Sequence, residues 1–533
     1  MTLFARLGLP QAWQARPRYT LLMVDWSDGE SFIRLWQRWK EDPCRPDRLH
    51  VVALSASLVE SSVLGSRLRA LTPSSLHSLV DQLVAQWPLN LPGTHRLDFE
   101  ELSVTLTIAV GPLAVTMPRL AVSADAIWAG EAAAVELPKV VSSESRSPTD
   151  RMLGLAVDQK EARHAVVVGA GIAGAGVAHA LALRGWRVQV LDVTSRRQQE
   201  HGAHVAAALT PMVTRDDDIR ARLSRAGSLR AQARWSQVSE DILWRCGALQ
   251  LQRMSGRIVD LKAVLAGLSF PPEWVRFVEA SEASDIAGLQ LNRGGLFFPT
   301  AARLRPERLI ETLLAVEGVE RLEVHVERVD RVDGQWHVLD KHGKTCAAAP
   351  QLILAGALGT QDILQRSALL EPGARLSAMH ALGGEITLLP ESALSGGPRC
   401  IVSGDGYVLP ALEGNCVVGS SYVHGAQCMA PSIAGGLGNI ERAAGLLGQS
   451  QLPAKFNNFA LDPLNGWAGW RAVLPGRLPF IGPLFNTQGL WVASGFASRG
   501  LTWSSLAGDL IAAALNGEPL PLERDIMDKI SQT

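Results

Sequence analysis

Three glycines, Gly169, Gly171 and Gly174, carry the spacing Gly-x-Gly-x-x-Gly directly after the apolar run 165–168. Glycine at these positions permits a tight turn and a close approach of the backbone to a pyrophosphate. The small residues at 175–183 then predict a helix, whose first N–H groups attract phosphate oxygens. The next strand, 186–191, is followed by Asp192, where a carboxylate accepts hydrogen bonds from ribose hydroxyls. The pattern predicts a nucleotide cofactor held by Gly169, Gly171, Ile172, Ala173, Gly174 and Asp192.

Two later segments favour FAD over NAD as that cofactor. Residues 350–354 form a predicted buried strand that leads into Ala355 and Gly356, and residues 489–501 predict a strand, a glycine turn and the start of a helix. A helix that starts at this turn aims N–H groups at a flavin ring and stabilises negative charge on it. An ordinary strand-to-helix turn is the alternative interpretation. The residues predicted to line this part of the cofactor site are Ala355, Gly356, Gly495, Ser498, Arg499, Gly500 and Leu501.

The C-terminal pattern Gly-x-Arg and Leu-Pro-x-Ile-Gly-Pro, at 469–471 and 478–483, resembles the glycine oxidase and D-amino-acid oxidase (DAO-type) flavoproteins. Further segments resemble the MnmC family, bifunctional enzymes of 5-methylaminomethyl-2-thiouridine synthesis at the tRNA wobble position. These segments are 294–299, 404–407, 419–425, 498–501 and 517–522. Two N-terminal segments, 35–39 and 86–97, are also similar to that family.

This resemblance implies an FAD-dependent oxidoreductase that acts on CH–NH donors. In the family, the FAD half removes the carboxymethyl group from 5-carboxymethylaminomethyluridine, which leaves aminomethyluridine and releases glyoxylate, and molecular oxygen reoxidises the flavin. Arg471 matches the arginine that binds the substrate carboxylate in this class, and a guanidinium suits bidentate binding of a carboxylate. Tyr407 is predicted as a catalytic hydroxyl donor over the flavin, and His204 as a residue that touches the flavin.

Each assignment has a plainer alternative. Arg471 could form an ion pair elsewhere, Tyr407 could simply pack in a strand, and His204 could be structural. For the whole chain the alternatives are a small-molecule amine oxidase of the glycine or sarcosine type and a non-catalytic tRNA-binding remnant. An arginine-rich segment fits either RNA phosphates or a solvated helix face. Its arginines are Arg215, Arg220, Arg222, Arg225, Arg230 and Arg234.

The N-terminal half of the MnmC family methylates the new amine with S-adenosylmethionine, and this chain departs from the family where that donor binds. The family's glycine-rich loop corresponds to residues 25–32, in which only Gly29 remains. The next strand ends in Leu54 and Ser55 instead of an acidic residue, and the family's catalytic segment stops after Gly130. Side chains in such a loop occupy space that the donor needs. We therefore predict a degenerate domain that binds no S-adenosylmethionine and that covers the oxidase or helps to hold tRNA.

The length of 533 residues predicts two or three α/β domains. We expect a degenerate Rossmann-like methyltransferase-type domain at 1–135, a linker at 136–162, a DAO-type fold at 163–525 and a tail at 526–533. Within the DAO-type fold, a βαβ FAD-binding domain is expected at about 163–260, 345–365 and 465–525. A mixed-sheet substrate domain is expected at about 260–345 and 366–464.

The composition bears on nucleic-acid binding, metal binding and the location of the chain. A net charge of −1 excludes a global basic field that would draw the chain to nucleic acid. Six scattered cysteines without a Cys-x-x-Cys pair indicate reduced thiols and predict no metal site. There is neither a signal-peptide apolar segment nor a run near the ~18 residues of a membrane span. We expect a cytoplasmic monomer whose partners are FAD, tRNA and oxygen.

Overall fold

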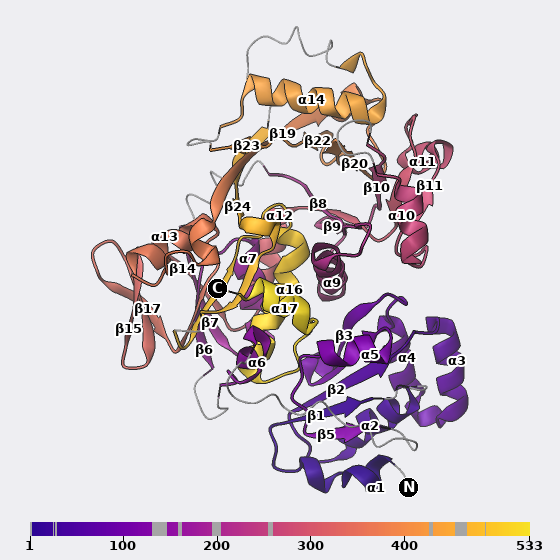
Figure 1. Cartoon of the computed structure of the whole chain (residues 1–533), viewed down its shortest axis with the longest axis vertical. Coiled ribbons are helices and arrows are strands. Elements are labelled where there is room, and N and C mark those ends of the chain that lie inside the picture. The colour runs from indigo at the N-terminus through magenta and orange to yellow at the C-terminus, as the bar shows by residue number, and fades with distance from the viewer. Residues whose placement is uncertain are drawn as a thin grey trace.

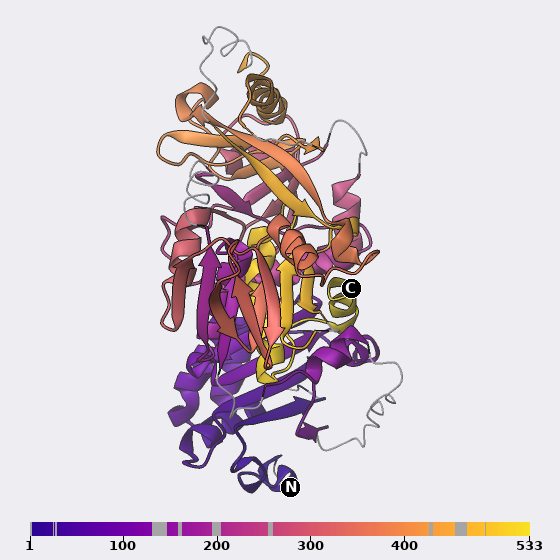
Figure 2. The ribbon, with the colours of Figure 1, turned by 90° about the vertical axis from the view of Figure 1, so that its left-hand side faces the viewer.

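Three sheet-based parts lie one above another along the long axis of the molecule, from the N-terminal domain at one end to a large mixed sheet at the other (Figures 1 and 2). The structure is a computed structural model. It describes residues 3–24, 26, 29–129, 147–157, 163–193, 204–253, 259–425, 430–452, 466–484 and 487–532.

The N-terminal domain, residues 3–129, contains a five-stranded sheet in the order β3-β4-β2-β1-β5. Four strands are parallel, and β3 forms an antiparallel hairpin with β4. The strands are β1 (Arg18–Met23), β2 (Arg48–Ser55), β3 (Gly93–Phe99), β4 (Val104–Val110) and β5 (Ala126–Trp128), and the longer helices are α2 (Glu30–Glu41), α3 (Ser61–Leu71) and α4 (His77–Gln86). Helix α2 forms because Phe32, Ile33, Trp36 and Trp39 recur on one face and are buried together.

The central sheet has the order β14-β7-β6-β18-β26-β25. Its strands are β6 (His164–Val168), β7 (Arg187–Asp192), β14 (Val319–Glu323), β18 (Gln351–Leu354), β25 (Phe480–Pro483) and β26 (Leu490–Ser494). Side chains of β6 alternate between two cores, which is why the strand is apolar throughout. One face packs on α7 (Ile172–Ala182), α12 (Pro306–Leu314) and α16 (Gly500–Asn516), and the other on the small sheet β15-β16-β17 (Arg328–Val332, Gln335–Leu339, Thr345–Ala349).

The third part is a nine-stranded mixed sheet in the order β11-β12-β10-β20-β21-β22-β19-β23, with β24 paired to β19. These strands are β10 (Ala248–Leu251), β11 (Arg276–Val278), β12 (Gly295–Phe298), β19 (His380–Pro390), β20 (Ile401–Gly404), β21 (Gly406–Val408), β22 (Asn415–Gly419), β23 (Val423–His424) and β24 (Gly466–Val473). Helix α14 (Ile433–Leu447) packs on this sheet. A short sheet of β8 (Ala207–Leu209), β13 (Ala302–Leu304) and β9 (Leu243–Trp244) lies beside it.

The fold class predicted from the sequence is confirmed, but several segments belong to other parts of the fold than expected. Strand β14 lies in the central sheet although 260–345 was assigned to the substrate part, and β10 and β24 lie in the mixed sheet although both were assigned to the FAD-binding part. The expected tail contains most of helix α17 (Arg524–Ile530), which is buried at three positions. The described part of the expected linker contains α6 (Pro148–Leu153), which is tied to α17 by an ion pair between Asp150 and Arg524.

The arginine-rich segment forms α9 (Ile219–Arg234), and it is neither a solvated face nor an open phosphate-binding face. Four of its arginines pair with carboxylates inside the protein. They are Arg222, Arg225, Arg230 and Arg234. The helix is packed between β3 of the N-terminal domain and α16 of the central part (Figure 1). The interpretation of these four residues as RNA contacts is therefore wrong.

Two buried histidines, His50 and His95, and the half-buried His179 make stability depend on pH. Burial lowers the pKa of His50 to about 3 and the pKa values of His95 and His179 to about 4. Below pH 6.5 the unfolded chain takes up protons on these imidazoles while the folded chain does not, so stability falls as the pH falls toward 4. Each such histidine contributes a slope of roughly 1.4 kcal/mol per pH unit.

We predict that His50→Leu removes about a third of this slope between pH 6.5 and 5, a range that lies above the titration of most unfolded carboxyl groups. The free energy of urea unfolding, measured across that range for both proteins, checks the prediction. An unchanged slope in the variant would show that His50 is already protonated in the folded state.

Candidate active site

The predicted nucleotide-binding residues meet at one edge of the central sheet. Strands β7, β6, β18 and β26 are neighbours and run parallel, so their carboxyl ends lie together. The loops that leave these ends carry Gly169, Asp192, Ala355 and Gly495. This is the edge at which ligands bind in parallel α/β sheets.

The first glycine loop has the shape that a pyrophosphate needs. Gly169 has φ of +106°, and a Cβ there would lie 2.7 Å from the carbonyl oxygen of Ala355. At Gly174 a Cβ would collide with the carbonyl oxygen of Gly169. At Gly171 it would meet no protein atom within 4 Å, so this position faces open space at the first turn of α7. The first and third glycines are thus required by the fold, whereas the second leaves room for a ligand.

Asp192 lies beside the same loop. One of its carboxylate oxygens accepts a hydrogen bond from the N–H of Ala170 at 3.0 Å, and the other accepts one from Val193 at 2.8 Å. Each oxygen has a second lone pair, so the carboxylate keeps capacity for ribose hydroxyls. Ile172 and Ala173 open α7, and their N–H groups belong to the unpaired first turn of the helix.

The second turn, at 495–500, places another helix N-terminus next to the first. A Cβ at Gly500 would lie 3.0 Å from the Cγ2 atom of Ile172, so α16 begins beside the start of α7. Arg499 is the N-cap residue of α16 and donates a hydrogen bond to the carbonyl oxygen of Thr210 at 2.8 Å. Burial lowers the pKa of Arg499, and Tyr422 opposes this shift electrostatically, so these two residues lie near each other. Ser498 is exposed, Leu501 is half-buried, and Gly356 N–H donates to Thr360.

Arg471 lies in β24, and a glycine on the neighbouring strand makes room for it. A Cβ at Gly384 of β19 would overlap the guanidinium. The Nη2 group donates to Ser420 Oγ at 3.0 Å, and the guanidinium stacks on the ring of Tyr422 at 4.9 Å from the ring centroid. Among the described residues no carboxylate pairs with Arg471. The Nη1 group also donates to the carbonyl oxygen of Gly383 at 3.5 Å. These bonds with described residues engage two of the five guanidinium N–H groups, and the other three are available to an anionic ligand, as the carboxylate-binding role requires.

Tyr407 faces the same space as Arg471. It lies opposite Gly419 in the sheet, and a Cβ at Gly419 would come 3.2 Å from the Tyr407 hydroxyl. Burial raises the pKa of Tyr407 to about 12, and the charge of Arg471 only partly opposes this rise. The phenol therefore remains protonated near neutral pH and can donate a hydrogen bond.

His204 joins this wall through an aromatic contact. Its ring stacks on Trp467 of β24, with ring centroids 4.8 Å apart and planes at 12°. Trp467 and Arg471 are four residues apart on the same strand and so lie on the same sheet face. The sequence did not identify Ser420, Tyr422 or Trp467 as site residues. The MnmC-like segment 419–425 contains Ser420 and Tyr422, but no role in the site was predicted for either residue.

In the N-terminal domain, the segment 25–32 that follows β1 carries the indole of Trp26. Trp26 stacks on Trp87 with centroids 6.0 Å apart, and its ring lies 3.1 Å from where a Cβ of Gly29 would be. Strand β2 ends at Ser55, whose hydroxyl donates to the Ser57 carbonyl oxygen. Of the departures identified in the sequence, Asp25, Ser27, Asp28 and Gly130 lie outside the described residues.

Within the described ranges, no three His, Cys, Asp or Glu side chains are grouped so that they could hold a metal ion. No helix in the same ranges is long and apolar enough to cross a membrane.

A family model described as FAD dependent oxidoreductase matches residues 164–514, which contain both glycine turns, Tyr407 and Arg471. The chain therefore belongs to the DAO family of FAD-dependent oxidoreductases, and its cofactor is FAD. It is 32% identical to the tRNA 5-methylaminomethyl-2-thiouridine biosynthesis bifunctional protein MnmC of Cupriavidus necator, over 98% of this chain and 90% of that protein. For the protein of the same name from Paraburkholderia phytofirmans the identity is 30%, over 98% and 91%. The chain is thus a member of the MnmC family.

Solved structures agree on the fold of the oxidoreductase part. Iminodiacetate oxidase from Chelativorans sp. BNC1 superimposes with a TM-score of 0.53 at 24% identity, over 67% of this chain and 96% of that one. Glycine oxidase from Geobacillus kaustophilus does so with a TM-score of 0.54 at 18% identity, over 70% and 99%.

The glycine loop yields a test of cofactor binding. We predict that Gly171→Ala weakens FAD binding about tenfold, because its methyl group enters the space that the pyrophosphate needs, while the apoprotein remains as stable as before. Flavin fluorescence titration gives the dissociation constant, and thermal unfolding of the apoprotein gives stability. Gly445→Ala, in α14 and also with nothing within 4 Å, is the matched control and should leave FAD binding unchanged. Equal affinities for the two variants would place the pyrophosphate elsewhere.

Proposed function

We propose that this chain is an FAD-dependent oxidase of the wobble uridine of tRNA. It acts on the C–N bond of the 5-carboxymethylaminomethyl group (or its 2-thio form), releases glyoxylate and leaves aminomethyluridine. The observation that carries the proposal is Arg471, a guanidinium without a carboxylate partner among the described residues, beside the protonated hydroxyl of Tyr407. The membership in the MnmC family supports tRNA as the substrate.

The side chains around Arg471 suit an N-substituted glycine. The guanidinium binds the carboxylate, and the stacked ring of Tyr422 together with Ser420 limits its orientations. Tyr407 donates a hydrogen bond to the same end of the substrate. Bound FAD supplies the two-electron oxidation of the carbon between nitrogen and carboxylate. The resulting imine is hydrolysed by water to glyoxylate and the primary amine.

A nucleoside assay tests the substrate. We predict that incubation with tRNA from cells that lack both MnmC activities converts carboxymethylaminomethyluridine into aminomethyluridine, detected by mass spectrometry after digestion. The Arg471→Leu variant should keep FAD but lose about a hundredfold in kcat/KM, mainly through KM, because a charge-assisted pair of about 2–3 kcal/mol is removed. Unchanged turnover of this variant would exclude Arg471 from the site.

The same assay separates the alternatives. Oxidation of sarcosine or glycine with no change in the tRNA would favour a small-molecule amine oxidase. Binding of both FAD and tRNA with no product from either substrate would favour a non-catalytic remnant.

We also propose that the methyltransferase step has been lost. The indole of Trp26, held between Trp87, Phe32 and Gly29, lies where a donor-binding loop would pass at the carboxyl end of β1. Strand β2 offers the hydroxyl of Ser55 where a ribose-binding carboxylate is needed. A domain with these features lacks both the space and the charge for S-adenosylmethionine.

Calorimetric titration tests this loss. We predict no heat of binding with S-adenosylmethionine up to millimolar concentration, and no methylaminomethyluridine in the tRNA assay when that donor is added. The Trp26→Gly variant reopens the space but does not restore the missing carboxylate, so it too should fail to bind. Micromolar binding by the unchanged protein would overturn the proposal.

A further inference from the structure

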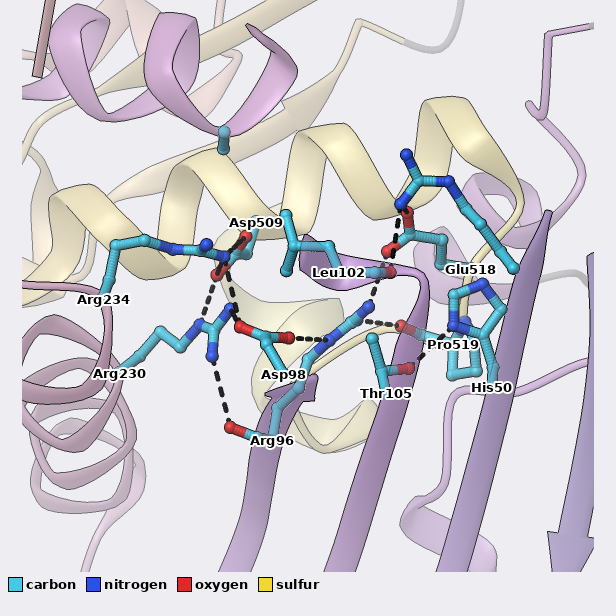
Figure 3. A network of polar contacts seen from close by, with 12 residues as sticks. His50, Arg96, Asp98, Leu102, Thr105, Arg230, Arg234, Asp509, Glu518 and Pro519 are labelled. Carbon is cyan, nitrogen blue, oxygen red and sulfur yellow. Dashed lines mark hydrogen bonds and ion pairs between the residues drawn. The ribbon is translucent and has the colours of Figure 1, made fainter. Parts of the chain in front are cut away.

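The N-terminal domain meets the oxidoreductase part through a cluster of buried charges (Figure 3). Eight residues of this region form an interface charge cluster. They are Arg48, Arg96, Asp98, Arg184, Arg230, Arg234, Asp509 and Glu518. Arg96 is 8% exposed, Glu518 2% and Asp509 0%, so these charges depend on one another rather than on water.

The cluster has two halves, and each is completed by strand β3 of the N-terminal domain. In one half Glu518 accepts hydrogen bonds from Arg184 at 2.8 Å and from Arg96 at 2.6 Å. In the other half Asp509 binds Arg184, Arg230 and Arg234. Asp98 accepts from Arg230 at 2.5 Å and lies 3.5 Å from Arg234.

Without Asp98, three guanidinium groups would share Asp509 as their carboxylate in that half of the cluster. Burial alone would raise the pKa of Asp98, yet Arg230, Arg234 and Arg96 hold it below its usual value, so the carboxylate is charged. An unbalanced buried charge is strongly unfavourable. Strand β3 therefore supplies the second carboxylate that Arg230 and Arg234 lack within the oxidoreductase part, while Arg96 of the same strand pairs with Glu518.

The cluster also lies on the helices that begin at the cofactor site, from the middle of α16 to the residues just beyond the ends of α7 and α16. Arg184 follows α7, Asp509 lies within α16, and Glu518 comes two residues after the end of α16. Helix α9 is a shorter connection between the cluster and the cofactor site than α7 or α16. A Cβ at Gly227 would collide with the carbonyl oxygen of Thr502, in the first turn of α16, and Arg230 lies one turn further along α9.

We propose that the N-terminal domain is a structural part of the FAD site. By completing the interface charge cluster, β3 fixes α9 against α16 and so holds the first turns of α7 and α16 in the arrangement that binds the cofactor. This role needs neither S-adenosylmethionine nor tRNA, and it stands independently of the substrate proposed above.

The test is the Asp98→Asn variant in the full chain. This substitution removes the negative charge of the side chain and keeps its shape. We expect the apparent Tm to fall by on the order of 5 °C. We also expect the FAD dissociation constant, measured by flavin fluorescence, to rise several-fold. The kcat of the FAD-saturated enzyme should stay within about twofold, because Asp98 is not part of the active site. Asp81→Asn is the matched control, since Asp81 pairs with Arg69 on the surface of the same domain. It should leave both Tm and FAD affinity unchanged.

A second variant covers the case in which Asp98→Asn folds poorly. Asp98→Asn combined with Arg230→Gln removes both members of the pair and leaves Asp509 with Arg184 and Arg234. We expect this double variant to bind FAD more tightly than Asp98→Asn alone. A lower Tm with unchanged FAD affinity in Asp98→Asn would overturn the proposal, as would no change in either quantity. Equal FAD affinity in the single and double variants would also overturn it.

Discussion

The contact between α7 and α16 is the constraint on which the cofactor site depends. A Cβ at Gly176 would lie 2.5 Å from the carbonyl oxygen of Ser504, and a Cβ at Gly508 would collide with the carbonyl oxygen of Gly176. Glycine at both positions lets the two helices touch backbone to backbone. Because they are this close, their N-terminal turns open side by side, at Ile172 and Gly500. Two helix N-termini at one place bring their partial positive charges together. This arrangement suits the two negative charges of the FAD pyrophosphate better than a single helix N-terminus would.

The substrate side of the site also depends on glycines that leave room for their neighbours, here in a sheet. Gly384 and Gly419 lie on β19 and β22, and each leaves the space that a larger neighbour fills, Arg471 in one case and Tyr407 in the other. Sheet side chains alternate between faces, so these glycines keep one face of the mixed sheet open for long polar groups. The opposite face needs no such space because α14 covers it, with Ser432 at its N-cap bonded to the carboxylate of Glu385.

The sequence predicted the parts of this molecule that depend on local pattern. The glycine fingerprint, the strands on either side of it and the DAO-type class follow from residues close together in the chain. The predicted division into FAD-binding and substrate parts was wrong for β10, β14 and β24, because strand order is set by contacts between residues far apart in the sequence. Helix α9 was misjudged for a related reason. A helix that is polar on all sides either is solvated or bridges domains, and only the positions of Asp98 and Asp509 decide between these.

In the N-terminal domain, the core that holds the fold is built mainly from residues outside the segment 25–32, where we propose that the donor site has been lost. Its sheet is held by a core of Trp36, Phe99 and aliphatic strand residues that lie outside the segment 25–32. Within that segment the indole of Trp26 stacks on Trp87. Strand β3 is under a different constraint, because Arg96 and Asp98 face buried charges of another domain. Loss of either residue leaves buried partners without a compensating charge, so this docking edge is constrained independently of any donor site.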